Sequence, residues 1–142
     1  MILKTHEVLL SCDYKKVGKN LISCSVYIKN NSKDTFYIIE KPLKYTSIVS
    51  FLGVDWGGAV GEYDASATFT IIPFLPGETL SDKLEFRVPS NIIKNASIGF
   101  SFLRNVSTYI NIDTINSKTT YKMNYNYFKQ NEINRVSGTF SW

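Results

Sequence analysis

The sequence has little of the chemistry that enzymes and metal proteins use. It contains one histidine, His6, and two cysteines, Cys12 and Cys24. A structural zinc site usually takes four histidine or cysteine ligands, so three such residues do not complete one. Phosphate-binding glycine loops, paired zinc-binding histidines and the glycine-flanked serine of hydrolases are missing as well. These absences argue against an enzyme, a metal site and a cofactor, and they favour a protein that works by binding.

The few reactive residues have structural explanations. His6 lies near the start of a predicted strand and is expected at the surface or at a strand edge, because a general base would need a carboxylate or a nucleophile beside it. Cys12 and Cys24 are expected to be two small core residues. The predicted pairing of their strands also allows a cross-strand disulfide, although a cytoplasmic setting favours reduced thiols.

Long apolar runs are also missing. No stretch approaches the roughly 18 apolar residues that a membrane-spanning helix requires. The first residues lack the basic start and the apolar core of a secretory signal. We therefore expect a cytoplasmic chain without a transmembrane segment.

Charge is distributed unevenly along the chain. The formal net charge is +4, but residues 51–90 carry six acidic residues against two basic ones. Eight lysines oppose four acidic residues in 1–50, and six basic residues oppose two acidic ones in 91–142. A nucleic-acid binder is not expected to hold an acidic middle third. The pattern predicts a polarised surface and no nucleic-acid partner.

Residues that favour β-strands are abundant. The length of 142 residues suits one domain, and Ile, Tyr, Phe, Val and Thr outnumber the strong helix formers. Within 20–30, apolar residues alternate with polar ones, which is the period of a strand with one face in the core. The same reasoning predicts strands at 3–12, 20–30, 35–40, 47–54, 67–72, 80–88, 96–103, 119–128 and 135–142, with shorter pieces at 59–63 and 109–112.

The first two predicted strands form a hairpin whose turn is supplied by residues 14–20. A turn centred near Gly18 would place the inward faces of both strands together. The opposed pairs are then Cys12 with Cys24, Leu10 with Val26, and Val8 with Ile28. Further along the chain, Pro73 is expected to end the strand at 67–72, because proline lacks the N–H that a strand donates.

Short strands, a turn about every ten residues and no helix longer than a turn predict an all-β fold. The expected architecture is a two-layer antiparallel β-sandwich of eight to ten strands in one domain, 1–142. Two segments, Val26-Tyr27-Ile28-Lys29-Asn30-Asn31-Ser32 and Leu75-Pro76-Gly77-Glu78-Thr79 ahead of a late strand, resemble bacterial immunoglobulin-like domains. The resemblance covers residues 3 to about 103 and implies an immunoglobulin-like sandwich. Residues 104–131 depart from it as an insertion or extra hairpin, and no functional residue is carried over.

An acidic hairpin end is the first candidate for contact with a partner. Asp55, Glu62 and Asp64 flank a turn that contains Trp56, all within ten residues. Carboxylates at this spacing suit a paired-carboxylate or calcium site. Carboxylates at the end of a hairpin are also commonly just solvated, so both interpretations stay open.

A tyrosine-rich strand is the second candidate. Tyr121, Tyr125 and Tyr127 lie in one predicted strand with lysines nearby. Tyrosine offers amphipathic contact area at a low entropic cost. Aromatic residues interleaved with basic residues also suit the binding of single-stranded nucleic acid. The three tyrosines share one face, however, so packing against the opposing sheet explains them equally simply.

These features lead to three functional hypotheses. The first is an inhibitor or immunity-type protein that occludes a partner toxin or hydrolase, because the chain is small, lacks catalytic motifs and has long irregular loops. The alternative is a carbohydrate- or lipid-binding module that uses aromatic residues such as Trp56 and Trp142. A third is a subunit that assembles through an unpaired edge strand. An inhibitor predicts a broad patch of mixed character, and a ligand-binding module predicts exposed aromatics at one end.

Overall fold

The computed structural model describes residues 1–39, 52–55, 68–104, 111–115, 118–124 and 134–142. Every regular element in this part of the chain is a β-strand, and every strand pair is antiparallel. The prediction of an all-β fold is confirmed. Within the same residues, no helix has the length and apolar character needed to cross a bilayer.

The described residues contain eleven strands, one more than the expected maximum. The strand predicted at 3–12 is two strands, because the Thr5 hydroxyl accepts a hydrogen bond of 2.9 Å from the N–H of Val8 and closes a turn between them. The second of these continues through most of the predicted turn at 14–20. The strands are β1 (Ile2–Lys4), β2 (Val8–Gly18), β3 (Leu21–Asn30), β4 (Phe36–Ile39), β5 (Leu52–Asp55), β6 (Thr68–Phe74), β7 (Thr79–Arg87), β8 (Asn95–Phe102), β9 (Asn111–Ile115), β10 (Lys118–Asn124) and β11 (Asn134–Ser141).

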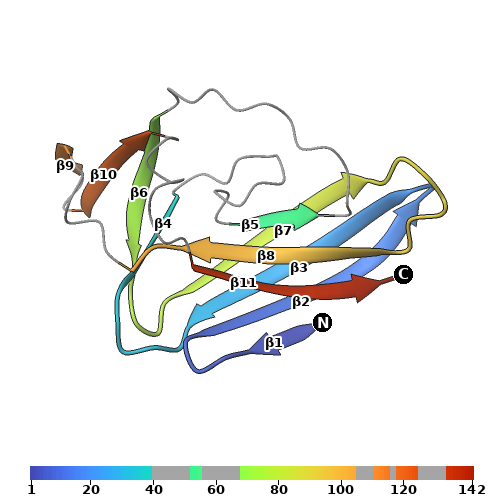
Figure 1. Cartoon of the computed structure of the whole chain (residues 1–142), viewed down its shortest axis with the longest axis horizontal. Helices are drawn as coiled ribbons and strands as arrows, with labels where there is room; N and C mark the ends of the chain where they lie inside the picture. The colour runs from blue at the N-terminus through green and yellow to red at the C-terminus, as the bar shows by residue number, and fades with distance from the viewer. Residues whose placement is uncertain (40–51, 56–67, 105–110, 116–117, 125–133) are drawn as a thin grey trace.

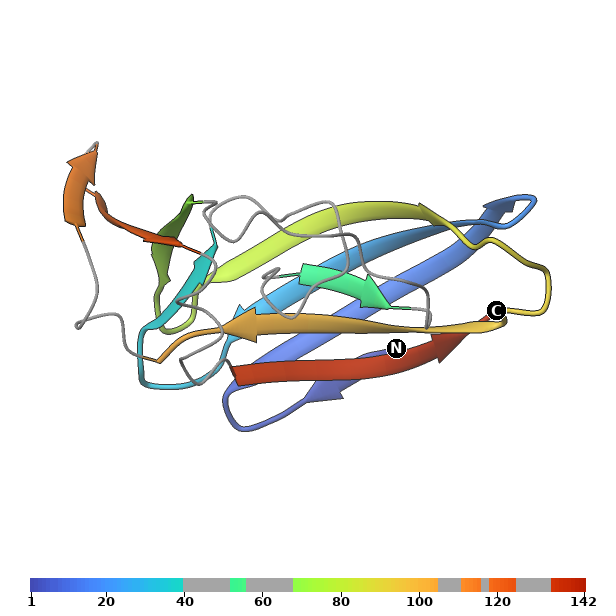
Figure 2. The ribbon, with the colours of Figure 1, turned by 45° about the horizontal axis from the view of Figure 1, so that its top comes forward.

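The strands form three sheets. The first sheet has the order β1-β2-β3-β7, the second β4-β6-β10-β9 and the third β11-β8-β5. The third sheet crosses the first, and the second sheet lies at one end of the molecule (Figure 1). Figure 2 keeps β9 and β10 at that end, opposite the turn between β2 and β3. A bridge between Tyr37 and Leu103 connects β4 to the end of β8.

Side chains from all three sheets meet in one hydrophobic core. Phe140 of the third sheet lies 4.6 Å from the ring of Tyr14 in the first sheet, and Phe102 lies 4.2 Å from Phe36 in the second. The alternation expected along β2 and β3 supplies the first sheet's share. Its fully or almost fully buried members are Val8, Leu10, Cys12, Ile22, Cys24, Val26 and Ile28.

The hairpin of β2 and β3 is present, but its register differs from the predicted one. Cys12 pairs with Val26 and not with Cys24. The left-handed residue of the turn is Asn20, with a φ of 59°, and not Gly18. Moving the turn by one residue moves the pairing by two. A shift of two keeps each side chain on its own face, which is why the predicted inward face is still the buried one.

Pro73 lies inside β6 and does not end it, contrary to the prediction. It pairs with Tyr37 of β4, whose N–H and C=O both bond to Leu103. Tyr37 and Pro73 are therefore a pair that exchanges no hydrogen bond. The backbone nitrogen of Pro73 therefore points away from β4 and towards the side of β6 that pairs with β10. On that side the pairing extends from Thr68 only to Ile71, so no strand partner needs an N–H from Pro73. Proline is tolerated at this position because the ladder does not use its N–H.

The polar side chain of Asn30 joins the first sheet to the second. It is fully buried at the end of β3. Its amide nitrogen donates to the carbonyls of Asp34 at 2.9 Å and Phe74 at 3.0 Å. Its amide oxygen accepts from the N–H and the hydroxyl of Ser32 at 2.9 and 2.7 Å. The amide therefore fixes where the chain leaves β3 and where β6 ends.

The backbone of Asn30 adds two hydrogen bonds to the turn that precedes β7. Its N–H donates to the carbonyl of Glu78 at 3.0 Å, and its C=O accepts from the N–H of Gly77 at 2.8 Å. Gly77 has a φ of 78°, which suits the third residue of a turn that begins at Leu75 and has proline second. The turn predicted at residues 75–79 is confirmed, and it is tied directly to β3.

We expect Asn30→Ala to lower the free energy of unfolding by about 2–3 kcal/mol, because the carbonyl of Phe74 loses its donor inside the protein. Asn31→Ala is the matched control, since Asn31 is exposed one residue further on, and its effect should stay within about 0.5 kcal/mol. Urea unfolding followed by circular dichroism measures both. Equal stabilities of the two variants would contradict a structural role for the Asn30 amide.

Candidate functional site

The structure describes one residue of each candidate site that the sequence suggested, and it places the two on different sheets. Asp55 is the last residue of β5 and pairs with Ser97 of β8. Tyr121 lies in β10 of the second sheet and pairs with Ile71, whose own side chain is fully buried. Trp56, Glu62, Asp64, Tyr125 and Tyr127 lie outside the described residues. Whether these seven residues contact a partner stays a prediction.

The residues with reactive side chains do not gather into a site in the described part of the chain. His6 is a surface residue, as expected, with its side chain 90% exposed. Cys12 and Cys24 are buried free thiols, which agrees with two small core residues. The hydrogen bond with Cys12, together with burial, raises the pKa of the Cys24 thiol above its ordinary value. Within the described residues, no three side chains of His, Cys, Asp or Glu form a group that could hold a metal ion.

Arg104 forms the most elaborate charged contact described, and that contact is structural. Its guanidinium donates to both carboxylate oxygens of Glu7, at 2.5 and 2.7 Å. It also lies over the rings of Phe36 and Phe102, at 5.6 and 5.5 Å from their centres. The hydrogen bond from Arg104 and its positive charge lower the pKa of the Glu7 carboxyl. The cluster holds the β1–β2 turn against the end of β8.

The outer face of the first sheet is the best candidate for a functional site. Strand pairing sets its side chains in rows across β2, β3 and β7. One row places Tyr27 between Ser11 and Ser81, and the next places Ser25 between Asp13 and Lys83. We call the six residues of these two rows the serine–tyrosine face.

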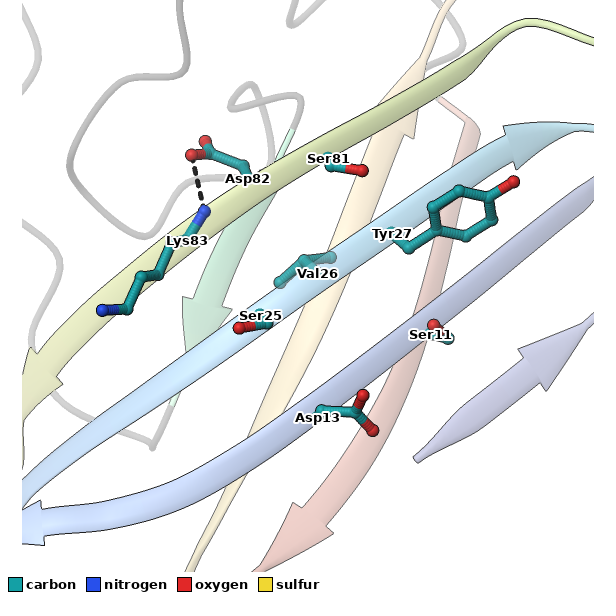
Figure 3. Close-up of a pocket in the computed structure, with 8 residues that line it drawn as sticks. All are labelled: Ser11, Asp13, Ser25, Val26, Tyr27, Ser81, Asp82 and Lys83. Atoms are coloured by element: carbon teal, nitrogen blue, oxygen red, sulfur yellow. Dashed lines mark hydrogen bonds between the residues drawn. The ribbon is translucent and has the colours of Figure 1, made fainter.

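The serine–tyrosine face surrounds a shallow depression of about 510 Å³. Figure 3 shows Tyr27 with Ser11 and Ser81 on the neighbouring strands, and Asp13 and Lys83 on opposite sides of Ser25. The side chain of Tyr27 is one of the few large apolar groups exposed in the described residues, at 37%. Small serines around it leave the ring open to a partner. The ammonium of Lys83 lies 3.3 Å from Glu85, and both side chains are more than half exposed.

Strand alternation pointed to only part of this face. The polar side of β3 is visible in the sequence, because Ser23, Ser25 and Tyr27 alternate with the core residues. Ser81 and Lys83 come more than 50 residues later, and only the pairing of β7 with β3 brings them beside Tyr27. The local signal identified β3 and its hairpin with β2, and missed β7 as the other neighbour.

No protein family, curated protein or solved structure matches this chain. The chemistry of the serine–tyrosine face itself must therefore indicate its use. It offers hydroxyl groups, one aromatic ring, a carboxylate and an ammonium. The arrangement suits reversible contacts, namely hydrogen bonds and packing against a flat aromatic ring.

We expect the contact of Glu7 with Arg104 to make stability depend on pH. Because the pKa of Glu7 is lowered on folding, its contribution is present above the unfolded-state pKa of about 4.3 and is lost as the pH falls through the folded-state pKa. Glu7→Gln should cost at most about 1 kcal/mol at neutral pH, because the pair is partly exposed. The difference in unfolding free energy between Glu7→Gln and wild type should become smaller at acidic pH.

Urea unfolding between about pH 7 and about pH 3 measures this effect. Glu85→Gln is the control, because Glu85 is half exposed and contacts only another exposed side chain in the described residues. A gap between Glu7→Gln and wild type that stays constant over this range would show that the carboxylate does not stabilise the fold.

We expect neither cysteine to react with iodoacetamide in the folded protein. Both thiols are fully buried, so the reagent cannot reach them, and the raised pKa of Cys24 further reduces the thiolate at that residue. Both should be alkylated in urea. Mass spectrometry after labelling counts the modified thiols, and modification of the native protein at the rate seen in urea would contradict the burial.

Proposed function

We propose that this chain is an inhibitor or immunity-type protein that neutralises a partner toxin or hydrolase by covering it. The contact would be made by the serine–tyrosine face, without catalysis or a cofactor, in the cytoplasm. One observation carries the proposal. An exposed tyrosine stands among serines with both signs of charge beside it, and tyrosine with serine is the combination that binding surfaces of antibodies use.

The extent of the surface supports a protein partner. Four strands span roughly 15 Å, and the nine residues of β7 extend about 30 Å. An area of this order suits the centre of a protein interface. Ile2, on β1, continues the row of Ser11 and Tyr27 and is 77% exposed. The face thus combines aliphatic, aromatic, hydroxyl and charged groups, which is the mixed character expected for protein recognition.

The proposed scaffold is an immunoglobulin-like β-sandwich. In it, the sheet β1-β2-β3-β7 and the sheet β11-β8-β5 are the two layers. Aromatic contacts between them support this arrangement, since Phe140 packs on Tyr14 and on Phe86, at 4.6 and 6.3 Å. With the inner faces engaged in this way, the outer face of the first sheet is left for a partner.

Two observations count against the other functional hypotheses. Trp142 is partly buried and packs against Phe86 and Phe140, at 6.1 and 5.9 Å, so only part of its ring is left for a carbohydrate. Strand β7 is an edge of the first sheet in the described residues, but it carries charges at Asp82, Lys83, Glu85 and Arg87. Charged edge strands resist pairing with another chain.

Substitutions on the face test the proposal. Tyr27→Ala should weaken binding of the retained partner by about 30-fold, as expected for a central tyrosine. Ser25→Arg should weaken it further, because it fills the open space beside the ring. Ser137→Arg is the matched control, since Ser137 is an exposed strand residue of the third sheet. Tagged proteins are incubated with lysate of the source cells, and retained proteins are identified by mass spectrometry.

The result expected is one stoichiometric protein retained by wild type and by Ser137→Arg, and lost from the two variants of the face. Circular dichroism confirms that all four proteins are folded. Retention of the same protein by every variant would show that another surface makes the contact. Retention of no protein, together with binding on glycan arrays, would contradict the inhibitor hypothesis and support a carbohydrate-binding module.

A further inference from the structure

The end of the molecule opposite the second sheet is built from two segments that are distant in sequence. One is the β2–β3 hairpin end, residues 15–20, and the other is the connection from β7 to β8, residues 87–94. The N–H of Val88 donates to the carbonyl of Asn20 at 2.9 Å, and the guanidinium of Arg87 donates to the carbonyl of Lys19 at 3.1 Å. Figures 1 and 2 both place the two segments together at this end. We call them the basic tip.

The basic tip exposes aliphatic side chains. Ile92 is 88% exposed, the highest value among the large hydrophobic residues described. Its position is fixed by a turn in which the Ser90 hydroxyl accepts from the N–H of Ile92 at 3.2 Å. Val17 lies at the register irregularity of β2 and is 45% exposed. These two side chains do not belong to the core, so they are available for a contact outside the chain.

The charged residues of the two segments that form the tip are all basic, and Glu85 of β7, in the strand row of Lys15, is an acidic residue at its border. No acidic residue occurs in 14–33 or in 86–112. The tip therefore presents only cations, all of them exposed. They are Lys15, Lys16, Lys19, Arg87 and Lys94.

We propose that the basic tip docks on an anionic phospholipid bilayer. Ile92 enters the boundary between headgroups and acyl chains, and the lysines contact the lipid phosphates and carboxylates. Lysine suits this position because its apolar stem can lie along the membrane while its ammonium stays in water. Five cations beside an exposed isoleucine provide both the electrostatic and the apolar part of such a contact.

The exposed aliphatic side chains of the basic tip favour a bilayer over a nucleic acid as the partner. Binding of a single-stranded nucleic acid relies on aromatic rings on which bases stack. No aromatic residue occurs in 15–20 or 87–94. A phosphate backbone would use the lysines but would leave Ile92 in water, whereas a bilayer uses both.

Docking at the tip is compatible with the proposed function and independent of it. The tip lies at one end of the long axis in Figure 1, and the serine–tyrosine face lies along the side of the first sheet. A molecule standing on its tip keeps that face open to a partner. The two surfaces share no residue, so variants of one leave the other intact.

Co-sedimentation of the full chain with vesicles tests the docking. Wild type should bind phosphatidylcholine vesicles containing about 30% phosphatidylserine, should bind pure phosphatidylcholine at least tenfold more weakly, and should be released by high salt. Ile92→Asp should reduce binding at least about tenfold. Lys16→Ser with Lys19→Ser should reduce it roughly 20- to 30-fold.

Matched controls come from the opposite end. Leu75→Asp replaces another exposed aliphatic residue in a turn, and Lys33→Ser replaces another exposed lysine. Both should bind vesicles like wild type. The proposal is overturned if wild type does not bind the anionic vesicles or if the control variants lose binding as much as the tip variants. It is equally overturned if Ile92→Asp has no effect while a labelled single-stranded RNA binds to the lysines.

Discussion

The fold depends on one buried amide. Asn30 is the last residue of β3. Its side chain and backbone bond to three other segments, namely the connection towards β4, the end of β6 and the turn before β7. A buried amide with unmatched groups would destabilise the protein, so each bond constrains the segment that supplies it. The bonds of the Asn30 backbone to Gly77 and Glu78 hold the start of β7 beside the end of β3, and the pairing of the two strands continues from there. The serine–tyrosine face exists only because β7 lies there.

The two ends of the molecule differ in how their loops are held. At the end near the second sheet, Asn30 and the contact of Arg104 with Glu7 tie connecting segments to the sheets. At the opposite end, backbone carbonyls do so: those of Lys19, Asn20 and Lys94 accept hydrogen bonds from Arg87, Val88 and Trp142. The tip also presents an exposed isoleucine together with exposed basic residues. This combination of apolar and positive side chains is the physical basis for placing membrane contact at the tip.

Alternation along the strands divides the first sheet into two kinds of surface. The inner side of β2 and β3 holds the buried residues of the core, including both thiols. The outer side holds serines, charged residues and Tyr27. Because each strand contributes to both sides, a substitution on the outer side can change recognition without removing core contacts. The function proposed for the face is therefore separable from stability by experiment.

Local patterns in the sequence determined that the fold is all-β, which side of β2 and β3 is buried, and where the turn at 75–79 lies, because alternation and turn chemistry act within a few residues. Local patterns did not determine the hairpin register, since Asn20 and not Gly18 takes the left-handed conformation. They placed Pro73 wrongly, because only the bond between Tyr37 and Leu103 makes its missing N–H harmless. The serine–tyrosine face and the basic tip each join segments more than 50 residues apart. Tertiary structure alone decided them, because strand neighbours are chosen by long-range burial and hydrogen bonding, which leave no local signal.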